Sequence, residues 1–182
     1  MKGTSYTQLV PFSEISPGQV GAIRNEVIKA LIQEATIRLK VEPEKLVVRD
    51  IRAKDDLALY SAGSAAAVED WGCVTGATIN TYETLATGNV GDQRWIGIFG
   101  VKITENCACT ALKFNIGGGD RAIWQLQGLR SDDDYVGICP SGVVIKQNDP
   151  YTISRFVRVA SGSALIVLKG VVVEPRGKVI SP

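Results

Sequence analysis

The sequence of 182 residues is long enough for one domain with an appended arm, and such a domain buries a core without needing disulfides or metals. Its 20 basic and 19 acidic residues leave a formal net charge of +1, which argues against a general polyanion binder, so we expect no direct contact with nucleic acid. Histidine is absent, which removes the commonest general base and metal ligand, and we therefore expect a protein that is not an enzyme.

Neither a secretory signal nor a membrane span is expected. Residues 1–15 lack the apolar run of a signal, and no later stretch has the roughly 18 uninterrupted apolar residues of a membrane helix. The protein is therefore expected to stay in the cytoplasm where it is made, so its cysteines are expected to be reduced. They lack paired C-x-x-C spacing, which favours buried apolar thiols over a zinc site, and no metal or other cofactor is expected. These cysteines are Cys73, Cys107, Cys109 and Cys139.

A helix is predicted over about residues 17–39. Ser16 is its candidate N-cap, Pro17 takes the first helical position and Gln19 completes a capping box. Apolar residues then recur mostly at spacings of three and four, so one broad stripe must be covered. That stripe either lies across the chain's own sheet or docks on a partner.

From Leu46 onward the pattern changes to β. Residues 46–60 indicate a strand followed by a charged turn, and the small residues 61–70 indicate a linker or loop. We therefore divide the chain into an N-terminal arm with the helix and first strand, residues 1–60, and a β-sandwich domain with a C-terminal tail, residues 61–182. Apolar segments separated by turn sequences predict about seven or eight strands, typical of an antiparallel, jelly-roll-like β-sandwich.

The clearest hairpin is predicted across residues 111–127. Leu112, Phe114 and Ile116 alternate with polar residues, and after the glycines Trp124 belongs to the apolar face of the second strand. The stretch GGGD (117–120) is therefore interpreted as a hairpin turn rather than a phosphate-binding loop, because it opens no helix. The aspartate run 132–134 is interpreted as a solvated turn, with a weak calcium site as the alternative.

The last strand is apolar on both of its faces. Leu165 to Val173 is interrupted only by Lys169 and Gly170, although an antiparallel strand usually shows one face to water. Its outer face needs a cover, which either the N-terminal helix or another subunit of a closed homotrimer would provide.

Three parts of the chain together resemble the small virion proteins of tailed bacteriophages that decorate or cement the capsid. They are the polar arm TSYTQLVPFSEISPG, the evenly spaced strands from Trp71 onward, and the closing ALIVLKGVVVEPRGKVISP. Many proteins of that class are trimers with an extended N-terminal arm and a β-rich body. The resemblance implies a protein that binds at junctions between major capsid subunits and stabilises the shell against the pressure of packaged DNA. It assigns no functional residue.

We therefore expect a non-enzymatic capsid cement or decoration protein, located in the virion and made in the host cytoplasm. Its expected partners are itself, as a homotrimer, and the major capsid protein or other virion proteins, with no membrane involved. The interface candidates are Tyr6, Leu9, Val10 and Phe12 in the arm, Trp95 at a strand start, and Val179 and Ile180 in the tail. Two alternatives are a single-jelly-roll shell or tail subunit, and a carbohydrate-binding or receptor-binding module with Trp95 as its exposed anchor.

Overall fold

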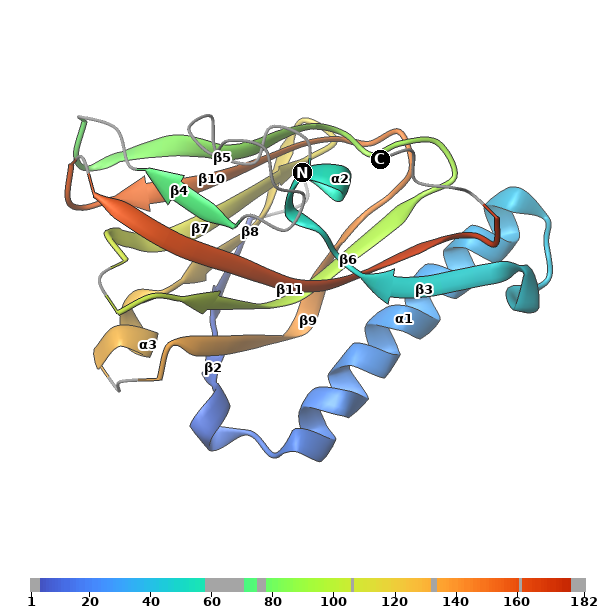
Figure 1. Cartoon of the computed structure of the whole chain (residues 1–182), viewed down its shortest axis with the longest axis horizontal. Helices are drawn as coiled ribbons and strands as arrows, with labels where there is room; N and C mark the ends of the chain where they lie inside the picture. The colour runs from blue at the N-terminus through green and yellow to red at the C-terminus, as the bar shows by residue number, and fades with distance from the viewer. Residues whose placement is uncertain are drawn as a thin grey trace.

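The computed structural model describes residues 4–57, 71–74, 78–105, 107–131, 134–160 and 162–177. Within these ranges the chain forms two β-sheets with one long helix on the outside of one of them (Figure 1). Short helical segments connect the larger elements. They are η1 (Phe12–Glu14), η2 (Pro43–Lys45), α2 (Ala53–Asp56) and α3 (Gln127–Ser131).

The strands are divided between two sheets. Sheet A has the order β1-β8-β7-β10-β5, and sheet B has the order β2-β9-β6-β11-β3, with β4 also paired to β11. The strands of sheet A are β1 (Ser5–Gln8), β8 (Gly119–Gln125), β7 (Cys109–Ile116), β10 (Pro150–Val157) and β5 (Thr81–Asn89). Those of sheet B are β2 (Val10–Pro11), β9 (Val136–Ile145), β6 (Trp95–Ile103), β11 (Ser163–Pro175), β3 (Leu46–Asp50) and β4 (Gly72–Val74).

Eight of these strands are connected as in a jelly roll. The chain passes from one sheet to the other between β5 and β6, β6 and β7, β8 and β9, β9 and β10, and β10 and β11, while β7 and β8 form a hairpin within sheet A. The resulting orders, β5-β10-β7-β8 and β3-β11-β6-β9, are those of a double-sheet jelly roll. The predicted antiparallel, jelly-roll-like sandwich with one N-terminal helix is therefore confirmed, and β1, β2 and β4 are short additions to it.

The boundary expected at residue 60 does not divide the structure, because the strands before it belong to the sandwich. β1 pairs with β8, β2 with β9, and β3 with β11. These pairings satisfy backbone groups of the arm that would otherwise need water or another partner. The linker expected at residues 61–70 lies outside the described residues.

The β7–β8 hairpin places one face of each strand in the core, as predicted. Gly117 and Gly118 form its two-residue turn with φ of 62° and 77°, a conformation that glycine adopts without strain. Phe114 and Trp124 are fully buried between the sheets, with ring centroids 4.6 Å apart. The interpretation of GGGD as a turn is therefore confirmed.

Helix α1 (Pro17–Leu39) runs diagonally across the outer side of sheet B (Figure 1). It begins with the predicted capping box, in which the Gln19 N–H donates to Ser16 Oγ at 3.2 Å and the Ser16 N–H donates to Gln19 Oε1 at 2.9 Å. Val27, Leu31 and Ala35 are buried and four residues apart, so they form the stripe that packs on the sheet. Neither α1 nor any other described helix is long and apolar enough to cross a membrane.

Helix α1 covers the C-terminal half of the outer face of β11, whereas Leu165 near the start of the strand is 37% exposed. Val171 and Val173 belong to the cluster between helix and sheet, whereas Val172 belongs to the core between the two sheets, which explains why this strand is apolar on both sides. Two covers were expected for this strand, the N-terminal helix or another subunit, and at Val171 and Val173 the cover is the chain's own helix. The cover over these two residues therefore comes from within the chain.

Candidate interaction surfaces

Two arginines and two carboxylates form a largely buried cluster where β3, α2 and β11 meet. Arg49 lies 2.7 Å from Asp56 and 2.9 Å from Glu174, and Arg94 lies 2.8 Å from Glu174. Burial by itself raises the pKa of Glu174, but the hydrogen bonds and charges of Arg49 and Arg94 outweigh it and hold that pKa below its ordinary value. An ionised Glu174 that is paired with two arginines is expected to link distant segments of the chain rather than to act as a general acid or base.

The four cysteines are buried free thiols, as expected. Burial raises the pKa of Cys73 to about 11. A hydrogen bond with Cys107, followed by burial, raises the pKa of Cys109. Protonated, buried thiols are poor nucleophiles and poor metal ligands. Within the described ranges, no group of three or more His, Cys, Asp or Glu side chains is arranged to hold a metal ion.

The outer face of sheet A carries exposed and half-buried side chains, whereas α1 packs on part of the outer face of sheet B. Strand register arranges the side chains of this face in three rows, in which Ala111, Ile123 and Ser154 are buried and the others are half-buried or exposed. We call the three rows the open face. The first row is Tyr6, Ile123, Lys113, Ser154 and Thr84; the second is Gln8, Gln125, Ala111, Phe156 and Tyr82; the third is Asp120, Asn115, Thr152 and Thr87.

Aromatic side chains gather around Lys113 on the open face. Its Nζ lies 4.5 Å from the centroid of the Tyr82 ring, and Tyr82 packs edge-on against Phe156 with ring centroids 5.1 Å apart. Lys113 Nζ is also 3.8 Å from Asp120 Oδ2, so the charged residues of the face offset each other. Burial, and then the charges of Tyr6 and Asp120, raise the pKa of Tyr82, which keeps its hydroxyl protonated. The face therefore presents rings and neutral hydrogen-bonding groups with no net charge.

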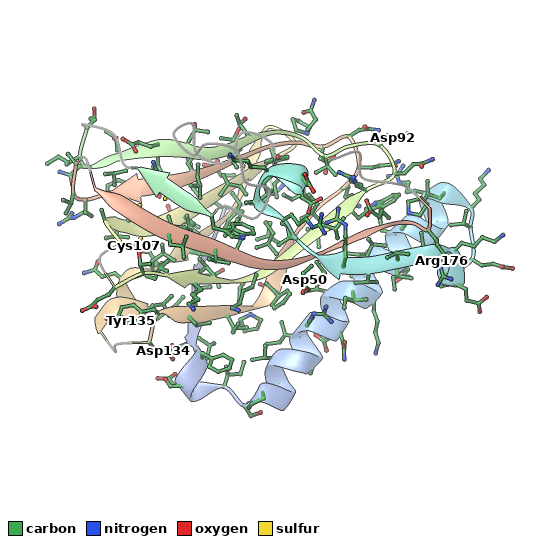
Figure 2. The ribbon with its side chains drawn as sticks, in the orientation of Figure 1. Asp50, Asp92, Cys107, Asp134, Tyr135 and Arg176 are labelled. Atoms are coloured by element: carbon green, nitrogen blue, oxygen red, sulfur yellow. The ribbon has the colours of Figure 1, made fainter. Side chains whose placement is uncertain are left out.

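The N-terminal arm closes one side of the sandwich. β1 adds to the edge of β8 in sheet A, and β2 adds to the edge of β9 in sheet B. Leu9 lies between these two strands and is buried in the core. At the end of the arm, the Ser13 N–H donates to Asp134 Oδ2 at 2.5 Å, and Figure 2 shows Asp134 beside this segment. The arm thus joins both sheets of its own chain.

Two of the expected interface residues are buried within their own chain. Leu9 is 3% exposed because it inserts between the sheets, and Trp95 is 0% exposed because α1 lies over it. The expectation of an exposed Trp95 is therefore corrected: its side chain faces outward from β6 but meets the helix. In this chain neither residue reaches the surface.

The remaining expected interface residues differ in exposure. Tyr6 is 74% exposed on the open face, and Phe12 is 44% exposed in η1. Val10 is partly buried in its pairing with β9. Val179 and Ile180 lie outside the described residues. Of the predicted set, the structure therefore offers Tyr6 and Phe12 as exposed apolar contacts.

The interface candidates predicted from the sequence did not include Tyr82, Phe156 or Lys113. The signal that could have found Phe156 is the alternation in YTISRFV, where Thr152, Ser154 and Phe156 share one face of β10. That alternation does not say which face is covered. Only the position of α1 shows that the open face belongs to sheet A.

No protein-family model and no curated protein sequence matches this chain. Its own geometry is therefore the basis for a functional proposal.

Proposed function

We propose that the protein is a non-enzymatic structural protein of a virion, a cement or decoration protein that binds and stabilises a viral capsid. The open face of sheet A is the observation that carries this proposal. It is almost uncharged and bears exposed or half-buried rings, and this combination is typical of the cores of protein interfaces. A surface for nucleic acid would instead need a basic patch.

The size of the open face bears on how the protein attaches. Its five strands, about 4.8 Å apart, span roughly 19 Å, and its three rows of alternate residues span roughly 13 Å. That is about 250 Å² of sheet plane, below the roughly 800 Å² of accessible surface that each partner contributes to a standard stable interface. One copy binds weakly by this face alone. We therefore propose attachment as a homotrimer to the major capsid protein or another virion protein.

Particle binding tests the proposal. The bound fraction is measured by co-sedimentation with particles from the protein's source, and the mass of the free protein by light scattering. The double variant Tyr6→Ala/Tyr82→Ala removes the two exposed rings of the open face. We expect at least about tenfold weaker particle binding, because aromatic anchors contribute disproportionately to interfaces.

Ile37→Ala is the matched control, because Ile37 is 66% exposed on α1, which lies on the other side of the sandwich. We expect this variant to bind particles normally. Unchanged binding by the double variant, or equal losses in both variants, contradicts the proposed role of the open face. A wild-type protein that binds no particle contradicts the capsid proposal itself.

Two other functions would use the same fold and are separated by simple measurements. A single-jelly-roll shell or tail subunit assembles into large particles alone, so light scattering of the pure protein distinguishes it from a cement protein. A carbohydrate-binding module loses Trp95 as its anchor but keeps the exposed Tyr82 beside Lys113, which suits stacking against a sugar ring. Hits on a glycan array that disappear in the Tyr6→Ala/Tyr82→Ala variant would favour it.

A further inference from the structure

The N-terminal arm lies along the edges of β8 and β9, and we call the space that it fills between them the groove. The eight strands of the jelly roll are complete without β1 and β2, which lie at the ends of their sheets. β1 is also the one strand whose pairing is parallel among the described strands, whereas the jelly-roll strands pair antiparallel. The arm therefore has the geometry of an added strand, a mode by which a sheet edge recognises an extended peptide.

The groove recognises the arm through backbone pairing and one apolar anchor. Register runs from Ser5 opposite Ala122 to Gln8 opposite Gln125. Leu9 then fills a slot above Gly137, where a Cβ would lie 2.9 Å from the Leu9 Cβ. The slot exists because residue 137 has no side chain, so the fit between anchor and groove is specific.

The segment between the arm and α1 is exposed. η1 contains no buried residue, and Ile15 and Ser16 follow in extended conformations. Pro11 precedes this segment and Pro17 begins the helix, so proline restricts the backbone at both ends. Because the segment buries no residue, a change in its path would cost the hydrogen bond from the Ser13 N–H to Asp134 but would leave the strand pairing of the arm and the packing of the helix in place.

We infer that the groove accepts the arm of a second copy of this chain, so that β1, Leu9 and β2 are exchanged between copies in the assembled protein. An exchanged arm makes the same pairings as the chain's own arm, which is why exchange of an identical element is a low-cost route to oligomers. Exchange also places Tyr6 of one copy in the first row of the open face of another. The inference rests on the proposed function, because binding to a particle would bring copies of the chain close enough to exchange their arms.

Engineered disulfides test this inference directly. Gln8 and Gln125 are opposite each other in the β1–β8 register and both are exposed, so paired cysteines at these positions lie within disulfide range. The native thiols are buried, which limits their interference. In the double variant Gln8→Cys/Gln125→Cys, a bond that forms under mild oxidation confirms that the arm docks in this register.

Mixing single variants then shows which copy supplies the arm. Gln8→Cys chains and Gln125→Cys chains are incubated together at high concentration, and on particles where these bind, and are then oxidised and separated without reductant. We expect a disulfide-linked dimer that contains one chain of each kind. Ile37→Cys mixed with Gln125→Cys is the control for random collision, because Ile37 is exposed on α1.

A mixture that yields no more cross-linked dimer than the control, while the double variant forms its bond only within one chain, overturns the inference. A double variant that forms no bond at all also overturns it, since the arm would not occupy the groove. Particle binding is scored separately. Binding without exchange refutes only this inference, and exchange without binding refutes only the capsid proposal.

Discussion

Gly97 sets the distance between α1 and sheet B, so a substitution there tests how the helix is held. A Cβ at Gly97 would lie 2.4 Å from Val27 Cγ1 and 3.0 Å from Leu31 Cδ1. Carbon atoms in favourable contact are about 3.5–4.0 Å apart, so the closer approach is short by about 1 Å. Val27 is β-branched and has one strongly preferred rotamer in a helix, which limits its ability to turn away.

The helix must therefore move outward when a methyl group is added at Gly97. Overpacking of this kind costs about 1–3 kcal/mol, so we expect Gly97→Ala to lower the free energy of unfolding by about 2 kcal/mol. Urea unfolding followed by tryptophan fluorescence measures this change, and Trp95 beneath the helix contributes a local signal. Val27→Ala removes the methyl group that clashes. The double variant Gly97→Ala/Val27→Ala should therefore be more stable than the sum of the single changes predicts, by about 1 kcal/mol or more.

Gly21→Ala is the matched control within the same helix. A Cβ at Gly21 would meet nothing within 4 Å, so the change should stabilise the protein by about 0.5–1 kcal/mol through helix propensity. A Gly97→Ala variant as stable as the wild type, or a cycle with no coupling to Val27, would refute the account of close packing between helix and sheet.

Three further predictions concern acid stability, the hairpin turn and the thiols. The pKa of Glu174 is depressed in the folded state, so its stabilising contribution is present above the ordinary carboxyl pKa of about 4.3 and is lost as the pH falls through the lower folded value. Circular dichroism should show this loss during acid titration, and Glu174→Gln should flatten it. Gly118→Val places a β-branched residue at φ of 77° and should cost about 1–3 kcal/mol, seen as a lower Tm. A thiol reagent should react slowly with the native protein and rapidly after denaturation, because burial raises the pKa of Cys73 to about 11.

Each of these predictions has a result that contradicts it. An acid titration unchanged by Glu174→Gln would mean that Arg49 and Arg94 do not hold that carboxylate ionised. Gly119→Ala adds a side chain beside the turn where nothing lies within 4 Å and φ is not positive, so it serves as the control for Gly118→Val. Equal effects of the two changes would exclude backbone strain as the cause. Rapid labelling of the native protein would show that the thiols are accessible.

Local sequence signals predicted the elements whose causes lie within a few residues. Ser16, Pro17 and Gln19 marked the start of α1, and the glycines at 117 and 118 marked the hairpin turn. Alternation placed Trp124 on the buried face of β8. Such signals depend on capping, on backbone conformation and on the two-residue period of a strand, all of which act between near neighbours. The fold class follows from their repetition along the chain.

Tertiary structure decided which surfaces of the protein are exposed, because each surface depends on segments that are far apart in the sequence. Trp95 points away from the core between the sheets, as an exposed anchor would, yet it is buried because α1, more than fifty residues earlier, crosses that side of β6. Because this helix packs on sheet B, the open face belongs to sheet A. The arm, expected to reach other subunits, pairs with β8 and β9 of its own chain because both sheets leave a free edge there. A period of two residues gives a strand two faces, but only the packing of distant elements determines which face meets solvent.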